Sequence, residues 1–169
     1  MNLKGTKTEG NLKDAFAGES QANRKYLAFA EKAEKEGYKQ IAKLFRAVAQ
    51  AETVHAMNHL KAAGEIKSTE ENLKAALGGE SYEVDSMYPP MVEEAEAAGD
   101  KKAATSFKWA LEVEKVHAKL YKKVLDLLGK ELPETDYYVC PVCGYTHEGK
   151  FEGKCPVCNT PGERFERID

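Results

Sequence analysis

The 169-residue sequence predicts an all-α four-helix bundle followed by a small metal-binding domain. The first observation is an internal repeat, since FRAVAQAETVHA at 45–56 returns as FKWALEVEKVHA at 107–118. The second is that each copy contains a Glu-x-x-His pair, which occupies one face of an α-helix because residues three apart are neighbours there. The third is that all four cysteines fall between Cys140 and Cys158, in two Cys-x-x-Cys pairs.

The repeat extends upstream of these two segments. Tyr26 is matched by Tyr88 at a spacing of 62 residues, whereas Gly18-Glu19-Ser20 is matched by Gly79-Glu80-Ser81 at a spacing of 61. Each half of the chain is therefore predicted to contain one helix that bears a Glu and a second that bears Glu-x-x-His. The alanines, valines and Phe that flank the Glu-x-x-His pairs indicate that this face looks into a core.

The first helix is predicted at 11–36 and the second at 38–63. In the first segment, apolar and small residues recur at close to the 3.6-residue period of an α-helix, and Glu19 lies on or beside this stripe. Gly37 provides a stop between the two helices, because glycine is common just past a helix end.

A long connection, 65–79, is predicted between the two halves, with room for a short helical turn at 71–77. Antiparallel neighbours usually need only about 2–8 residues, so this link is long enough to cross over the bundle. The third helix is predicted at 80–98 and the fourth at 101–128.

The third helix departs from the repeat. One extra residue stands between its Glu and its Tyr, and Pro89-Pro90 removes backbone donors that a regular helix would use. An extra residue beside a metal-ligand position is typical of a π-bulge, although two short helices with an irregular joint would explain it equally well. This helix also carries Glu83, a carboxylate that the first half lacks.

The helical domain with its polar linker is predicted at 1–136 and the small domain at 137–169. The linker, 129–136, has no apolar period, and the composition then changes to aromatic residues, Gly and Pro. A segment as short as the second domain cannot form a hydrophobic core large enough to stabilise it, so it needs a cross-link such as a bound metal.

The composition limits the possible partners. With a net charge of −3, the chain lacks the excess of basic residues that is typical of nucleic-acid-binding proteins. No apolar run approaches the ~18 residues of a membrane span, and we expect a soluble, cytoplasmic protein without a membrane partner. In a chain without an export signal, clustered cysteines favour a metal site over disulfides.

The helical residues form the pattern of a dinuclear metal site. One Glu from each of two helices and a Glu-x-x-His from each of the other two are the ligands of di-iron carboxylate bundles. Any one of these positions alone would be an ordinary surface Glu or core His, and only the duplicated spacing favours a metal. The six residues are Glu19, Glu52, His55, Glu80, Glu114 and His117.

The cysteines form the second predicted site. Each Cys-x-x-Cys makes a tight turn whose two thiolates suit adjacent corners of a tetrahedron, and two such turns complete it. The four are Cys140, Cys143, Cys155 and Cys158. The pattern leaves zinc possible as a substitute for iron. The aromatic residues around it favour a rubredoxin-like iron centre: Tyr137, Tyr138, Tyr145, Phe151 and Phe165.

Over nearly its whole length the chain resembles the rubrerythrins. The motifs that carry the resemblance are GES, ExxH, GES-x-E-x-x-x-x-YP, ExxH and CPVCGY…CPVC. The resemblance implies a ferritin-like di-iron bundle joined to a rubredoxin-like domain with a mononuclear iron bound by four cysteine thiolates. It adds Glu83 to the six di-iron ligands, as a carboxylate that one iron exchanges for a His when the redox state changes. It also implies that Tyr26 and Tyr88 lie near the di-iron centre.

One residue departs from the family pattern. Asn159 stands where the second cysteine turn usually has Gly. Asn tolerates a left-handed backbone better than most residues, so we expect the site to be tuned and not lost.

The resemblance implies a peroxidase that reduces hydrogen peroxide to water and protects against oxidative stress. Electrons are expected to enter through the rubredoxin-like iron, from NAD(P)H through a separate reductase or from a rubredoxin, because the chain has no nucleotide-binding fingerprint. A ferroxidase or iron-handling protein is the first alternative, and a zinc-bound structural module is the second.

The resemblance also implies a homodimer or higher homo-oligomer. From His117 to Leu128 the helix spans roughly 16 Å at 1.5 Å per residue, which separates the two metal sites of one chain. A head-to-tail dimer would place one chain's thiolate-bound iron beside the other chain's di-iron site. The long connection also permits exchange of helix pairs between chains, in a domain-swapped assembly.

Overall fold

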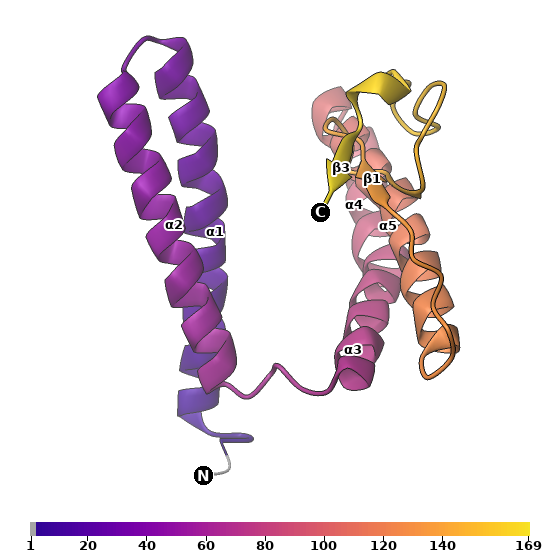
Figure 1. Ribbon diagram of the computed structural model, residues 1–169. Coiled ribbons are helices and arrows are strands. Elements are labelled where there is room, and N and C mark those ends of the chain that lie inside the picture. Colours follow the sequence, from indigo (N-terminus) through magenta and orange to yellow (C-terminus); the bar gives the residue numbers. More distant parts are fainter. Residues whose placement is uncertain (1–2) are drawn as a thin grey trace. The chain divides into compact units, whose positions relative to one another are not determined.

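The computed structural model describes residues 3–169, which are mostly helical and end in a small sheet (Figure 1). The chain is divided into two compact units, the first ending at Lys67 and the second beginning at Ser68. The predicted fold class, helices followed by a small four-cysteine domain, is confirmed. None of the described helices is long and apolar enough to cross a membrane.

The first unit is a hairpin of α1 (Lys7–Lys35) and α2 (Lys39–Ala62), drawn in indigo and purple in Figure 1. The predicted start of α1 was four residues late, because Thr6 caps the helix by accepting a hydrogen bond from the Glu9 amide at 3.2 Å. The chain leaves α1 through Gly37, whose φ of 84° favours glycine.

Alanine lines the seam between α1 and α2. The buried alanines of this hairpin are Ala30, Ala33, Ala42, Ala49 and Ala56. Such small side chains let the two backbones approach closely. The seam also buries the amide of Asn23, whose Nδ2 donates to Ala49 O at 2.7 Å and to Thr53 Oγ1 at 2.8 Å. This buried amide is thus satisfied, as buried polar groups must be.

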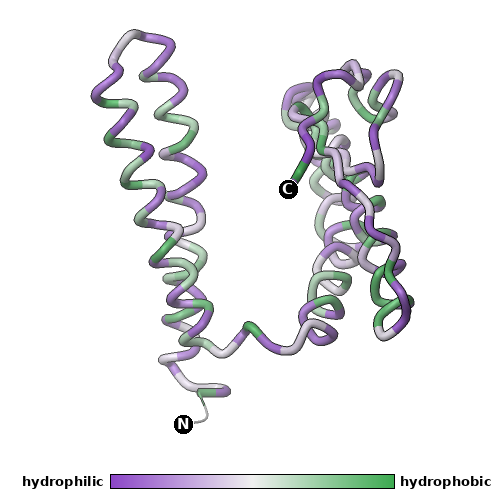
Figure 2. The backbone as a smooth tube through the Cα atoms, viewed as in Figure 1, coloured by the Kyte–Doolittle hydropathy of each residue, from purple (hydrophilic) through white to green (hydrophobic). Residues whose placement is uncertain are grey.

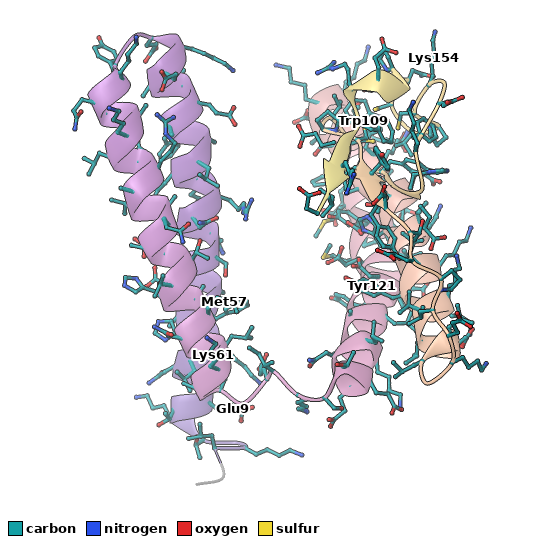
Figure 3. All side chains as sticks on the ribbon, in the orientation of Figure 1. Glu9, Met57, Lys61, Trp109, Tyr121 and Lys154 are labelled. Carbon is teal, nitrogen blue, oxygen red and sulfur yellow. The ribbon has the colours of Figure 1, made fainter. Side chains whose placement is uncertain are left out.

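A hairpin of two helices covers only one side of each. Apolar and polar residues alternate along both helices in Figure 2, and several large apolar side chains stay in solvent. Leu44 is 62% exposed, Phe29 47% and Met57, labelled in Figure 3, 40%. The hairpin therefore keeps an apolar surface beyond its own seam.

The second unit begins with α3 (Thr69–Tyr82), and here the sequence-based prediction was wrong. The third helix was expected from residue 80, yet it starts eleven residues earlier, so the coil between α2 and α3 is only 63–68. Ser68 accepts a hydrogen bond from the Glu71 amide while Glu71 Oε2 accepts one from the Ser68 amide. This capping box starts the helix and leaves no long crossing connection.

A π-helical turn, η1 (Glu83–Met87), joins α3 to α4 (Tyr88–Ala97). The Tyr88 amide donates to Glu83 O, five residues back, so the extra residue of the second repeat is absorbed in this wide turn. Pro89 and Pro90 follow in the first turn of α4, where proline is tolerated. Of the two explanations for the irregular third helix, the π-bulge is confirmed.

Helix α5 (Lys101–Leu127) packs against α3, η1 and α4 and completes the helical part of the second unit. Asp100 caps its start, with Oδ1 accepting hydrogen bonds from the amides of Lys102 and Ala103, both at 3.0 Å. Val113 on α5 is 2% exposed.

The small domain is a three-stranded antiparallel sheet in the order β2-β1-β3. Its strands are β1 (Tyr137–Val139), β2 (Thr146–Glu148) and β3 (Glu166–Ile168), with a 3-10 turn η2 (Gly162–Arg164) before β3. Four of the five predicted aromatic residues pack around the buried cysteines: Tyr138, Tyr145, Phe151 and Phe165.

We expect Gly162→Ala to destabilise the small domain. A Cβ at this buried position would lie 2.8 Å from Phe151 O and 3.1 Å from Gly153 O, both backbone atoms that cannot move cheaply. Overpacking of this kind costs about 1–3 kcal/mol, so the small domain should melt at lower temperature. Thermal melting followed by near-ultraviolet circular dichroism of the packed aromatic rings measures the effect.

The matched control is Gly10→Ala in α1, where nothing lies within 4 Å of the new Cβ. That change should stabilise its helix by about 1 kcal/mol. An unchanged melting temperature of the small domain in Gly162→Ala would contradict the packing at Gly162.

The small domain lies on α5 of its own chain. The linker turns back after α5 and runs along the helix, drawn in orange in Figure 1. Lys123 Nζ is 2.6 Å from Glu148 Oε2, which ties α5 to β2. Near the middle of the helix, a Cβ on Gly144 would be 3.9 Å from Val113 Cγ1. The linker thus brings the cysteine turns back towards the predicted ligand residues on α5.

Candidate metal centres

The first hairpin brings together Glu19 from α1 with Glu52 and His55 from α2. His55 Nδ1 is 2.8 Å from Glu52 Oε2 and 4.0 Å from Glu19 Oε1. One donor atom from each of the three residues lies within 4.8 Å of the others. The i, i+3 spacing on α2 places the carboxylate and the imidazole together, as the sequence predicted.

The second unit repeats this arrangement with Glu80 from α3 and with Glu114 and His117 from α5. His117 Nδ1 is 2.6 Å from Glu114 Oε2. A cavity of about 440 Å³ adjoins the triad and is lined in part by Glu80, His117 and Tyr121, the last labelled in Figure 3. Each unit therefore holds one triad of two carboxylates and an imidazole.

The carboxyl groups of the second triad favour a cation. Burial, a hydrogen bond to Glu114 and the charge of Glu114 raise the pKa of Glu80 to about 7. Burial and the Glu114 charge also raise the pKa of Glu83, against the opposing effect of His117. Neighbouring carboxylates resist ionising together unless a positive charge compensates them. Carboxylate oxygen with neutral imidazole nitrogen is a donor set that iron accepts, so these residues fit the metal.

Glu83 and Tyr88 lie near the second triad, whereas Tyr26 belongs to an aromatic cluster of the first hairpin. Glu83 begins the π turn, close enough to Glu114 and His117 for their charges to act on it. Burial and the nearby carboxylates, Glu83 first among them, raise the pKa of Tyr88. Tyr26 packs its ring against the rings of Phe29 and Phe45, 6.3 and 6.2 Å away between centroids.

The four cysteines converge in the small domain. Cys140 Sγ is 3.5 Å from Cys158 Sγ, and Cys143 Sγ is 3.5 Å from Cys155 Sγ. With metal–sulfur bonds of about 2.3 Å a tetrahedral site has edges of about 3.8 Å, so these sulfur atoms need to move apart only slightly to bind a metal. Burial raises the pKa of Cys143 and of Cys155, and a bound cation would compensate their thiolates.

Two matching turns hold the cysteines. The Gly144 amide donates to Cys140 O and the Asn159 amide to Cys155 O, both at 2.9 Å. Gly144 has a φ of 82°, and Asn159, with a φ of 61°, is the one residue other than glycine with positive φ in the part of the chain that the structure describes. Asn159 thus adopts the left-handed conformation that its position requires.

One residue near a triad was missed by sequence analysis. Thr146 on β2 has its Oγ1 2.9 Å from His117 Nε2. The two residues are 29 positions apart and belong to different elements, so no local pattern in the sequence relates them.

Comparisons with known proteins find matches for both the helical part and the cysteine-containing part of the chain. A family model described as rubrerythrin matches residues 10–125, and one for the rubredoxin-like domain of rubrerythrin matches residues 138–166. The chain is similar to rubrerythrin-2 of Clostridium acetobutylicum, with 35% identity over 98% of this chain and 99% of that protein. It is also similar to a rubrerythrin of Porphyromonas gingivalis, with 39% identity over 98% and 92% of the two chains.

Nigerythrin provides the structural comparison. The chain is 37% identical to nigerythrin of Nitratidesulfovibrio vulgaris over 92% of this chain and 83% of that protein. A solved structure of nigerythrin in the fully reduced, all-ferrous state matches with a TM-score of 0.59 and 35% identity, over 95% and 86% of the two chains.

Proposed function

This chain belongs to the rubrerythrin family, and from that premise we propose that it is a peroxidase that reduces hydrogen peroxide to water. Family membership provides two cofactors, a di-iron centre in the helical part and a single iron held by four thiolates in the rubredoxin-like domain. The combination of the two in one chain is the observation that carries the proposal. An iron-storage protein has no need of a thiolate-bound iron through which electrons enter.

We assign the ligands as follows. The di-iron ligands include Glu83, a carboxylate beside Glu114 and His117, and the charge effects among these three residues support this role. The proposed set is Glu19, Glu52, His55, Glu80, Glu83, Glu114 and His117. The single iron is assigned to Cys140, Cys143, Cys155 and Cys158, in a domain that we place at 137–169 after a helical domain at 1–136.

When bound, the two irons supply the two electrons with which one peroxide and two protons become two waters. The protein residues bind and orient the peroxide. The raised pKa of Tyr88 keeps its phenol protonated, so its hydroxyl can donate a hydrogen bond to a carboxylate or a peroxide oxygen. Tyr26 occupies the matching position of the other half, and Glu83 is the third residue to which we give a catalytic role. The cavity beside Glu80 and His117 has room for the small substrate.

Rapid mixing of the fully reduced protein tests this function. We expect the di-iron site to be oxidised much faster by hydrogen peroxide than by oxygen. A ferroxidase would prefer oxygen, and that order of rates would overturn the proposal. Metal analysis and the visible spectrum provide a second check, because ferric thiolate absorbs visible light and zinc does not.

Glu83→Ala should leave iron bound but slow peroxide turnover. Six ligands remain, whereas the carboxylate that opens the π turn is gone. Losing a carboxylate beside a metal-binding His typically costs about 10–100-fold in activity. Steady-state turnover and iron content are measured on the same sample.

Asp85→Ala is the matched control, since Asp85 lies on the same π turn and is exposed. The control should turn over normally. If Glu83→Ala also keeps its full rate, Glu83 does not have the role given to it here.

We also propose an external electron donor and a homo-oligomeric state. The donor is an NAD(P)H-dependent reductase or a rubredoxin that meets the rubredoxin-like domain. The homodimer or higher homo-oligomer is proposed because the resemblance to the rubrerythrins implies it. Light scattering on the purified protein tests it, and a monomer over the whole concentration range would contradict it.

A further inference from the structure

Thr146 joins the small domain to the helical ligand residues of its own chain. Its Oγ1 lies 2.9 Å from His117 Nε2 and 3.1 Å from Gly144 O. Both Thr146 and His117 are half-buried, with 24% of the His117 side chain exposed. The hydroxyl therefore has two well-placed partners, an imidazole nitrogen and a backbone carbonyl.

The chemistry of these groups determines the direction of each hydrogen bond. A carbonyl oxygen can only accept, so Thr146 donates its single hydroxyl hydrogen to Gly144 O. The same hydroxyl must then accept from His117, which places a hydrogen on Nε2. On the other side of the ring, Nδ1 lies 2.6 Å from Glu114 Oε2, so a hydrogen occupies that contact when no cation is present. A cation that binds Nδ1 would displace this hydrogen and leave the one on Nε2. This is the tautomer that a metal ligand needs.

We propose that Thr146 is a positioning residue that fixes the Nε2–H tautomer and the ring orientation of His117, so that Nδ1 faces the metal. The inference rests on the proposed function only in taking His117 as a metal ligand. Hydrogen bonds to the far nitrogen of a ligand histidine commonly set its tautomer, and their loss costs about 10–100-fold in metal affinity.

The same hydroxyl links the two metal sites. Gly144 directly follows Cys143, and its amide donates to Cys140 O at 2.9 Å. From the cysteine turn, the chain of bonds runs through Gly144 O and Thr146 Oγ1 to the His117 ring. The rubredoxin-like domain therefore contacts a di-iron ligand of its own chain, which the roughly 16 Å of helix beyond His117 had argued against.

The test compares Thr146→Val with Thr146→Ser and with Thr135→Val, the same change in the linker at an exposed residue. The full chain is loaded with zinc, which is diamagnetic, and its histidines are labelled with nitrogen-15. In the unaltered protein the hydrogen bond to Thr146 Oγ1 should protect the His117 Nε2–H from exchange with water. Valine keeps the shape of threonine and suits a strand, so the small domain should fold.

We expect Thr146→Val to abolish this protection and to weaken zinc binding about 10–100-fold. Thr146→Ser should restore both, and Thr135→Val should change neither. The proposal is wrong if the His117 signal and the zinc affinity of Thr146→Val are unchanged, or if the serine variant loses as much as the valine variant. It is also wrong if the His117 Nε2–H is unprotected from exchange in the unaltered protein. None of these measurements uses peroxide, so a failed peroxidase assay would overturn the proposed function alone.

Discussion

Cys140→Ser should abolish donor-driven peroxide turnover, by at least ~100-fold, because a four-thiolate site that loses one thiolate no longer holds its iron well. Cys140 is 1% exposed and lies at the centre of the small domain with Cys155 and Phe165. The visible colour of the ferric thiolate should disappear with the activity. Turnover with the reductase and absorption spectra measure both.

The same variant should keep one turnover of peroxide when its helical site is reduced chemically. The triads lie on helices α1, α2, α3 and α5, and none of their residues belongs to the small domain. Val142→Ser is the matched control, because Val142 is 43% exposed within the same cysteine turn. If the single turnover of Cys140→Ser vanished as well, the two iron sites would not be separable.

Mixing two inactive variants should not restore donor-driven activity. One variant is Cys140→Ser, which lacks the thiolate-bound iron, and the other combines Glu52→Ala with Glu114→Ala, which removes a carboxylate from each triad. Thr146 contacts His117 of its own chain. In a mixed dimer, the intact four-cysteine iron site therefore lies beside the damaged triad of the same chain. Activity after co-refolding should stay at least ~100-fold below that of the unaltered protein, since both single defects persist.

The control for the double variant is Glu65→Ala with Glu112→Ala, two exposed glutamates on the same two units. That pair should be fully active. A head-to-tail dimer with electron transfer between chains predicts the opposite result for the mixture. In that dimer the intact four-cysteine iron site of one chain would face the intact di-iron site of the other. Recovery in mixed dimers, shown to form by two affinity tags, would exclude the own-chain route.

Local patterns accounted for most of the fold and for the pairs within each site. Gly37 and Gly99 stop helices because each adopts a positive φ, 84° and 70°, that few other residues adopt readily. The extra residue of the third helix became a π turn at Glu83. The start of α3 at Thr69 was missed, although Ser68 and Glu71 show the capping-box pattern in the sequence itself.

The sequence by itself determined which side chains form the triads' Glu-x-x-His pairs and the two cysteine turns. These pairs are three residues apart, and the geometry of a helix or a tight turn brings them together whatever the rest of the chain does. The tertiary structure alone decided that Asn23 bonds to Ala49, that the linker folds back along α5, and that Thr146 reaches His117. The two side-chain contacts join residues 26 and 29 positions apart, and they depend on how whole elements pack, which no short-range spacing encodes.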